Sequence, residues 1–367
     1  MPAPFYIGSE IYRDSSYGSW HPLRIPRVSL TTDLLRALEW LPPAQYVDSP
    51  QATEEQLVRF HDANYVAAVV EAERTQVVDD DIRRRYNIGI NGNPIFPEMF
   101  RRPATASGGS IHAARLLRRT KAIYNPAGGT HHGRANAASG FCYFNDPVLA
   151  IYALLDDGHE RVGYVDVDAH HGDGVQDAFH DDARVLTVSV HEAGRWPGTG
   201  LVEDRADGAA RNLPVPSGFN DDEMAYLLDR AIQPVLDAFD PSVLVLQCGA
   251  DALSDDPLSR LGLSNNALWD VVEKLHRRPV PLLVLGGGGY NPWSLARCWA
   301  GVWAVLNGRE IPTVLPEAAT TLLRDVEWRH RLARNPPDHW FNTLRDSPNH
   351  GPVRDAVKSV AEQATKQ

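Results

Sequence analysis

The chain has 367 residues, and 36 Lys and Arg stand against 47 Asp and Glu, which gives a formal net charge of −11. A dedicated nucleic-acid-binding protein normally carries a basic face, so this balance argues against nucleic acid as the direct ligand. No apolar run approaches the ~20 residues of a membrane helix, so we expect no membrane partner. Three cysteines and an amino-terminal region without a signal-peptide pattern predict a cytoplasmic protein without a disulfide framework.

Five short apolar runs predict the strands of a mainly parallel sheet, because they lack polar alternation and are bounded by turn signals. The runs are Ala122–Tyr124, Arg161–Val165, Val185–Val190, Val243–Leu246 and Pro281–Leu285. Helical patterns lie between them, over Pro147–Leu155, Asp221–Phe239 and Asn265–His276. The alternation predicts a single-domain α/β fold with helices on both faces of the sheet, in three αβα layers over residues 1–367. The last stretch, Glu310–Gln367, is helical in pattern and is expected at the edge of the sheet.

Chemically active side chains follow four of the five runs. Ligands of an open parallel sheet bind beyond the carboxyl ends of its strands, so clusters at these positions point to one site. The clusters are NPAGGTHHG after the first run, DVDAHHGDG at the end of the second, QCGAD after the fourth and GGGGYNP after the fifth. Four strand ends are therefore predicted to deliver histidine, aspartate and tyrosine side chains to one edge.

Asp168, His170 and Asp251 are candidates for the ligands of a divalent metal such as Zn²⁺. In DVDAH, residues two apart point the same way if the strand continues, so Asp168 and His170 can face one ion. Asp166 has the same parity and would lie behind them. Three protein ligands leave a coordination position for water, which favours a catalytic site over a structural one. The alternative is that these side chains are solvated loop residues or helix caps.

His131 and His132 are adjacent and follow a glycine pair. Metal-assisted hydrolysis needs a base and an acid, and two histidines with separate carboxylate partners can divide these roles at different pKa values. Asp166 and Asp173 are the candidate partners. Tyr290 follows four glycines, so its phenol can reach a developing oxyanion. No P-loop arrangement follows the glycines, which disfavours phosphate binding.

Aromatic side chains cluster near these motifs, with Phe141 and Tyr143 in GFCYFND and Trp196 in RWPGTG. They are either core residues or the walls of a narrow channel that would hold an aliphatic chain such as a lysine stem. Residue types alone leave both interpretations open.

The order of the motifs NPAGGTHHG, GFCYFND, YVDVDAHHGDGVQDAF, TVSVH, PGTG, CGAD and LGGGGYNP resembles that of the histone deacetylase family, which has the arginase/deacetylase fold. The chain looks most like its bacterial branch of acetoin-utilisation and histone-deacetylase-like proteins. The resemblance runs from about Tyr6 to Leu306. It implies one deacetylase domain with a catalytic core at about 6–306 and a helical extension at about 310–367.

The resemblance implies metal sites of two kinds. Zn²⁺, with Fe²⁺ or Mn²⁺ as alternatives, would be bound by Asp168, His170 and Asp251. Structural K⁺ would occupy an inner site that involves Asp166, Asp168, His170 and Ser189. An outer K⁺ site would lie near Phe179 and Val185.

The resemblance also implies the catalytic roles. Tyr290 would polarise the acetyl carbonyl. His132, oriented by Asp173, would act as general base and also as general acid. His131, oriented by Asp166, would serve as an electrostatic partner.

Four further residues would contact the substrate. The carbonyl of Gly140 would accept the amide N–H, Phe141 and Trp196 would flank the lysine tunnel, and Leu258 would lie at its rim. Many relatives carry an aspartate on a rim loop, where this chain reads NIGINGNPIFPEMF with Asn91 or Asn93 nearby. We therefore expect weaker recognition of a peptide backbone.

The expected function is a zinc-dependent hydrolase that removes the acetyl group from Nε-acetyl-lysine of proteins, with acetyl-CoA synthetase as a candidate substrate. A deacetylase of acetylpolyamines is the alternative, because the net charge and Glu98 in the rim loop would suit a cationic substrate. A binding module without activity and a two-metal ureohydrolase are further alternatives. The oligomeric state stays open.

Overall fold

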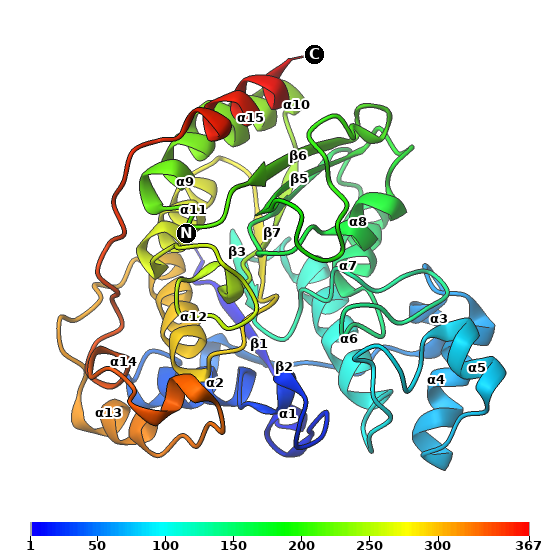
Figure 1. The fold of residues 1–367 in the computed structure, drawn as a ribbon. Helices are drawn as coiled ribbons and strands as arrows, with labels where there is room; N and C mark the ends of the chain where they lie inside the picture. Colours follow the sequence, from blue (N-terminus) through cyan, green and yellow to red (C-terminus); the bar gives the residue numbers. More distant parts are fainter. Residues whose placement is uncertain (1, 367) are drawn as a thin grey trace.

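The computed structural model describes residues 2–366, and within them eight parallel strands form one open sheet in the order β2-β1-β3-β8-β7-β4-β5-β6 (Figure 1). Every strand pair is parallel, so the carboxyl ends of all strands lie at the same edge. The strands are β1 (Phe5–Gly8), β2 (Tyr46–Asp48), β3 (Ala122–Asn125), β4 (Val162–Asp166), β5 (Val185–Glu192), β6 (Ala210–Val215), β7 (Val243–Gln247) and β8 (Leu282–Leu285).

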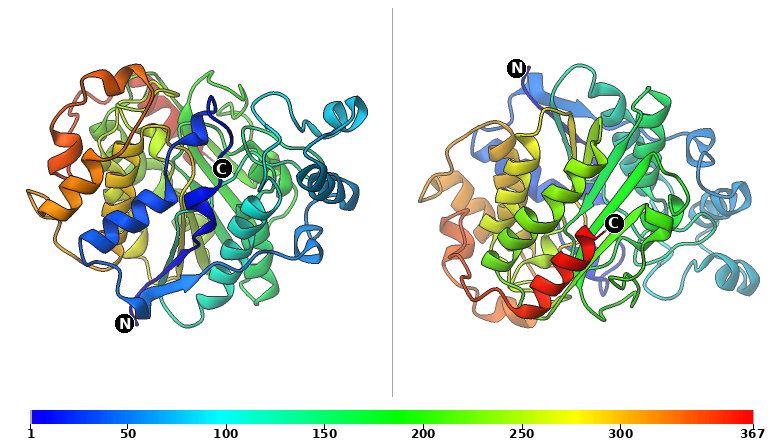
Figure 2. Two further views of the ribbon diagram at one scale, coloured as in Figure 1. Left: turned by 90° about the horizontal axis from the view of Figure 1, so that it is seen from below. Right: turned by 90° about the horizontal axis from the view of Figure 1, so that it is seen from above.

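Helices cover both faces of the sheet and bury one hydrophobic core on each face (Figures 1 and 2). One helical layer and its neighbours consist of α1 (Ile11–Asp14), α2 (Val28–Ala37), α9 (Asp221–Leu227), α10 (Gln233–Phe239), α11 (Asn265–His276), α12 (Pro292–Leu306), α13 (Glu317–Arg324), α14 (His339–Asn342) and α15 (Asp355–Thr365). The opposite layer consists of α3 (Glu54–Leu57), α4 (Ala63–Thr75), α5 (Asp80–Tyr86), α6 (Arg101–Leu116), α7 (Asp146–Asp156) and α8 (Asp173–Ala178).

The five predicted strands are confirmed as β3, β4, β5, β7 and β8, each within two residues of its predicted bounds. Their side chains are buried on both faces, which explains why their sequences show no polar alternation. The α/β fold in three layers is confirmed as well. The sequence did not predict β1, β2 or β6, which extend the sheet at its two edges.

The helix predicted over Asp221–Phe239 is confirmed over its whole length, with one irregularity inside it. A π-helical turn at Leu228–Ile232 separates α9 from α10. Pro234 lies in the first turn of α10; it lacks an N–H group, and its ring would clash with the carbonyl four residues earlier. The wider π turn accommodates this clash.

The predicted carboxyl-terminal helical stretch is divided into three short helices, α13 to α15. Of these, α15 packs against the edge strand β6, as the sequence predicts (Figure 1). The guanidinium of Arg297 is fully buried and donates to the carbonyl of Thr343 at 2.6 Å and to Asp346 at 2.7 Å. These bonds fasten the segment between α14 and α15 to the core. No helix within residues 2–366 has the length and apolar character needed to cross a membrane.

Candidate active site

The strand β4 ends at Asp166, so the predicted alternation of Asp168 and His170 along a continuing strand does not occur. Instead, the loop after β4 turns back on itself, and hydrogen bonds from backbone N–H groups to aspartate side chains hold it in that shape. The backbone N–H of Asp168 donates to Oδ1 of Asp166 at 3.1 Å, and that of His170 donates to Oδ1 of Asp168 at 3.0 Å. The predicted convergence of these side chains is present, but turn geometry produces it.

Asp168, His170 and Asp251 form a buried cluster whose ligand atoms all lie within 4.8 Å of one another. Nδ1 of His170 lies 2.9 Å from Oδ2 of Asp251 and 3.2 Å from Oδ1 of Asp168. A Cβ on Gly249 would lie 2.1 Å from Oδ2 of Asp168, and one on Gly288 would lie 2.0 Å from Oδ2 of Asp251, so only glycine fits at either position. Two buried carboxylates beside an imidazole need a cation, and this donor set fits Zn²⁺.

The sequence-predicted partner of His131 is Asp166. Nδ1 of His131 donates to Oδ2 of Asp166 at 2.7 Å, and its Nε2 lies 3.8 Å from Oδ1 of Asp168. Tyr164 also donates to Asp166, at 2.8 Å, and holds that carboxylate in place. Burial alone would lower the pKa of His131, but the charges of Asp166 and Asp168 outweigh burial and raise this pKa to about 9.

The partner of His132 is Asp173, whose Oδ1 accepts from Nδ1 at 2.7 Å. Burial and the neighbouring charge of His131 lower the pKa of His132 to about 3, against the opposing effect of Asp173. Arg134 donates to the second oxygen of Asp173. The pKa values of the two rings, whose centroids are 3.9 Å apart, are therefore shifted in opposite directions.

Tyr290 lies between the Asp168–His170–Asp251 cluster and the molecular surface, with 9% of its surface exposed. Gly287 and Gly289 have φ angles of +121° and +134°, so the loop before Tyr290 requires glycine. The backbone N–H of Tyr290 donates to Oδ2 of Asp256 at 2.6 Å. Burial raises the pKa of the Tyr290 phenol well above its usual value, so the hydroxyl stays protonated and can donate a hydrogen bond.

An open cavity of about 930 Å³, here called the vestibule, leads from the surface to His132, His170 and Tyr290. Phe141, Trp196 and Leu258 line it, so these three aromatic and apolar residues are walls of a channel. Gly140 lies between two rings: a Cβ there would be 2.5 Å from Trp196 and 2.6 Å from His132.

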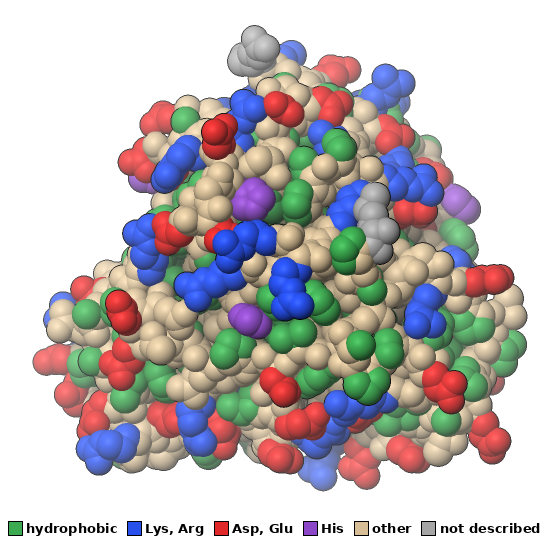
Figure 3. Space-filling view, turned by 180° about the vertical axis from the view of Figure 1, so that it is seen from behind, with side chains coloured by type: hydrophobic (Ala, Val, Ile, Leu, Met, Phe, Trp, Pro, Cys, Tyr) green, Lys and Arg blue, Asp and Glu red, His purple; other side chains and the backbone are tan. Residues whose placement is uncertain are grey.

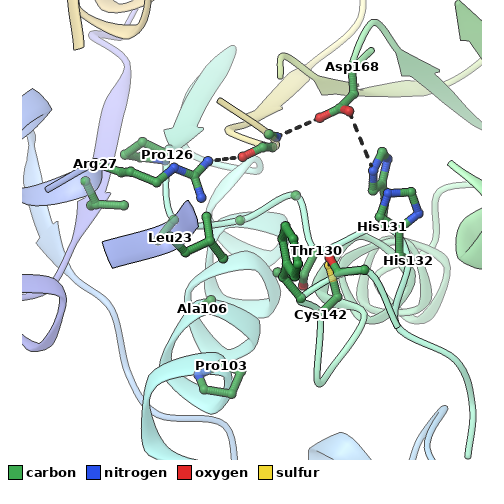
Figure 4. Close-up of a pocket in the computed structure, with 18 of the residues that line it drawn as sticks. Leu23, Arg27, Pro103, Ala106, Pro126, Thr130, His131, His132, Cys142 and Asp168 are labelled. Atoms are coloured by element: carbon green, nitrogen blue, oxygen red, sulfur yellow. Dashed lines mark hydrogen bonds and ion pairs between the residues drawn. The ribbon is translucent and has the colours of Figure 1, made fainter. Parts of the chain in front are cut away.

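A second, smaller cavity of about 70 Å³ lies behind the Asp168–His170–Asp251 cluster (Figure 4). Arg27 lies on one side of it, and His131, His132 and Asp168 lie on the other. The guanidinium of Arg27 donates to the carbonyl of Gly287 and holds the glycine loop. Arg27 lies in the stretch HPLRIPRVSL, outside the motifs that the sequence predicts to form the site.

The structure distinguishes the two rim asparagines. Asn91 is exposed and lines the vestibule. Asn93 is fully buried, and its Oδ1 accepts from the backbone N–H of Phe141 at 3.0 Å, so it shapes the tunnel wall and does not face the substrate. Glu98, which the sequence placed in the rim loop, does not line the vestibule.

The predicted K⁺ residues lie at the β4–β5 border. Asp166 is paired in register with Ser189, and Phe179 and Val185 bracket the turn between α8 and β5. The K⁺ sites stay predictions.

Sequence reasoning also missed Arg134 and Asp256, which orient catalytic candidates without carrying a motif of their own. Arg134 stands two residues after the histidine pair, and Asp256 stands five residues after Asp251. Proximity to the motifs is the one signal that could have pointed to them. Burial and the charge of Asp251 raise the pKa of Asp256 to about 8.

Comparison with known proteins places this site in a family. Residues 21–306 match the profile of the histone deacetylase domain. Histone deacetylase 2 of Oryza sativa subsp. japonica is 40% identical over 311 residues, which cover 82% of this chain and 60% of that protein. Histone deacetylase 1 of Homo sapiens is 36% identical over 308 residues, 82% of this chain and 64% of that protein. The match thus spans about 60% of the length of these relatives.

Solved structures agree over the whole chain. The crystal structure of a histone deacetylase homologue from Aquifex aeolicus superposes with a TM-score of 0.95 at 36% identity, and 100% of each chain is covered. A histone deacetylase homologue complexed with SAHA gives the same TM-score at 35% identity and the same coverage. With its family profile, relatives and fold in agreement, the chain belongs to the histone deacetylase family.

Proposed function

We propose that the chain is a zinc-dependent deacylase that hydrolyses the amide of Nε-acetyl-lysine in proteins. The single observation that carries the proposal is the arrangement around the buried cluster: two histidines, each hydrogen-bonded to its own aspartate, and a tyrosine all border one metal-binding set. The family of the relatives supports it.

Asp168, His170 and Asp251 would hold the metal. Zinc bound there would polarise the acetyl carbonyl and lower the pKa of a water molecule toward ~7. Fe²⁺ or Mn²⁺ would suit the same donors.

The remaining residues would orient the substrate and move protons. Nε2 of His132 is free to accept a proton because Asp173 occupies Nδ1, and it would pass that proton to the leaving amine. His131 would stay charged and stabilise developing negative charge. The hydroxyl of Tyr290 would donate to the carbonyl oxygen of the substrate, and the carbonyl of Gly140 would accept the amide N–H.

The vestibule would take an extended aliphatic chain between Phe141 and Trp196, with Leu258 at the rim. We place the protein in the cytoplasm, with acetylated proteins as substrates and acetyl-CoA synthetase as a candidate among them. Structural K⁺ would bind beside Asp166 and Ser189.

The alternative is deacetylation of acetylpolyamines, since the tunnel would admit any narrow aliphatic amide. Purified, zinc-loaded protein should hydrolyse an acetyl-lysine peptide with a higher kcat/KM than acetylputrescine. The reverse order would establish the alternative. An inert protein would indicate a binding module, and two manganese ions per chain at this site would indicate a ureohydrolase. The Tyr290→Phe variant, which removes one hydroxyl, should lower kcat about 10²- to 10³-fold.

A further inference from the structure

The mouth of the vestibule is lined by arginines although the whole chain is acidic. Arg195 and Arg260 line the vestibule itself. They also line an adjoining open cavity of about 450 Å³, together with Arg331. We call Arg195, Arg260 and Arg331 the arginine rim. Arg331 comes from the carboxyl-terminal extension, so residues far apart in the sequence build one basic surface.

The carboxylates of this region are already engaged by protein donors. Glu192, the one carboxylate that lines the vestibule, accepts from the Arg195 guanidinium at 3.0 Å and from the backbone N–H of Arg260 at 2.9 Å. Asp256 is buried and accepts from two backbone N–H groups, those of Tyr290 at 2.6 Å and Leu258 at 2.8 Å. Asp255 accepts from Nε1 of Trp340 at 2.8 Å.

Two guanidinium groups of the rim are, by contrast, free. Arg260 and Arg331 are exposed, and neither side chain has a hydrogen-bond or ion-pair partner among residues 2–366. Arg195 is fixed beside them, because it also donates to the carbonyl of Leu258 at 2.9 Å. The rim therefore offers two unpaired positive charges next to the residue that borders the tunnel.

The residues that line the vestibule include one acidic side chain, Glu192, and two arginines. On the face seen from behind, acidic side chains are spread over the surface and mixed with arginines and lysines (Figure 3). Glu98, which the sequence placed in the rim loop, does not line the vestibule. The net charge of −11 is thus not gathered where a substrate enters.

We propose that the arginine rim makes the enzyme selective for acetyl-lysine within acidic segments of proteins and disfavours cationic amides such as acetylpolyamines. The inference rests on the proposed deacylase function and names its substrate class. In an extended peptide, side chains two residues apart point to the same side. A glutamate two residues before or after the acetyl-lysine would therefore face the enzyme with it, and one of the two would lie on the side of the tunnel that Arg260 and Arg331 line.

Three peptides that differ only at these two flanking positions test the inference: Glu, Gln or Lys on both sides of one acetyl-lysine. We expect kcat/KM to be about three- to tenfold higher for the Glu peptide than for the Gln peptide at low salt, the range given by one or two exposed ion pairs. The Lys peptide and acetylputrescine should be poorer than the Gln peptide. The Glu preference should shrink at about 0.5 M salt, because exposed charges are screened.

The variant R260Q/R331Q should bring the Glu-to-Gln ratio close to one, and R260E/R331E should favour the Lys peptide. Arg309→Gln is the matched control: Arg309 is also exposed but follows the carboxyl end of α12 and does not line the vestibule. It should keep the wild-type ratio. Equal turnover of the peptides by the wild type, or a Glu preference that survives in R260Q/R331Q, would overturn the role of the arginine rim. Either result would leave the proposed deacylase function intact. If the wild type hydrolysed none of the peptides, the proposed deacylase function itself would be wrong.

Discussion

At the scale of single residues, the two adjacent histidines show how local electrostatics separates identical side chains. His131 lies between two aspartates and is charged, whereas His132 has one aspartate partner and the charged His131 beside it. The pKa of His131 is raised to about 9 and that of His132 is lowered to about 3. The opposite shifts favour the neutral form of His132, which is the form that acts as a base.

Replacing His132 by alanine should lower kcat by about 10²- to 10⁴-fold, because the variant lacks the neutral imidazole that accepts the proton. Asp173 keeps its hydrogen bond with Arg134, so the fold and the bound metal should be unchanged. Steady-state kinetics, circular dichroism and metal analysis check these outcomes together. Turnover near that of the wild type would remove His132 from the mechanism.

His61 connects the loop of the histidine pair to the helical layer. Its Nε2 accepts from the backbone N–H of Asn145 at 3.0 Å, and its Nδ1 donates to the carbonyl of Arg134 at 2.9 Å. Burial lowers the pKa of His61 to about 4. The folded protein therefore holds His61 neutral, so its contribution to stability is complete above the unfolded pKa of about 6.5 and is lost as pH falls toward 4.

Between pH 7.5 and pH 5, wild type should consequently lose more unfolding free energy than His61→Gln, whose side-chain oxygen can still accept from Asn145. The difference between the folded and unfolded pKa of His61 corresponds to about 3 kcal/mol of unfolding free energy, and about 2 kcal/mol of it is lost by pH 5. Urea unfolding of both proteins at the two pH values measures the difference. An identical pH dependence would show that His61 is not held neutral.

At the scale of elements, the rim loop between α5 and α6 holds one wall of the tunnel, because its backbone contacts the ring of Phe141. Phe141 has a φ of +69°, and its ring passes next to Gly92 of the rim loop. A Cβ on Gly92 would lie 2.5 Å from Cε1 of Phe141. Because Asn93 holds the Phe141 backbone, the ring itself must move if Gly92 gains a side chain.

The Gly92→Ala variant should therefore lower kcat/KM for an acetyl-lysine peptide about tenfold, mainly through KM. Gly158→Ala is the control, since Gly158 also has a positive φ, +95°, but a Cβ added there would have no neighbour within 4 Å. Both variants carry the backbone strain of about 1 kcal/mol. If both lost activity equally, strain and not displacement of Phe141 would be the cause.

The helix α15 is fastened to the core by one ion pair. Arg354, at its start, donates to the buried Glu223 through Nε and through a terminal nitrogen, both at 2.6 Å. Arg354→Ala leaves that carboxylate without its cation and should destabilise the protein by about 1–3 kcal/mol. Thermal unfolding and proteolysis of the carboxyl-terminal segment measure this loss. Lys358→Ala, which removes an exposed pair with Asp355, should change neither readout appreciably.

At the scale of the whole molecule, the sequence predicted the middle of the sheet and not its edges. Runs such as VLVL and LLVL are continuous apolar segments, and burial on both faces requires such segments. The edge strand β6 reads ARNLPV and includes polar residues and a proline, so it carries no comparable pattern.

The site likewise contains residues that the sequence predicts and residues that only the folded structure reveals. Asp168, His170 and Asp251 were predictable because they stand at the ends of recognisable strands. His61 and Asp256 were not, because their roles depend on contacts that only the folded chain creates. His61 bonds to a residue 84 positions away, and Asp256 bonds to one 34 positions away. The choice between Asn91 and Asn93 likewise required the path of the rim loop.

The proposed mechanism depends above all on one metal ion, held by Asp168, His170 and Asp251, that enables the hydrolysis of acetyl-lysine. The decisive experiment is a titration of chelator-stripped protein with Zn²⁺, in which turnover of an acetyl-lysine peptide and bound metal are measured in parallel. We predict no turnover without metal and full turnover at about one equivalent per chain. We also predict that Asp251→Asn binds Zn²⁺ at least about tenfold more weakly and stays inactive at one equivalent. Full turnover by the stripped protein, or a requirement for two metal ions per chain, would show that the mechanism is wrong.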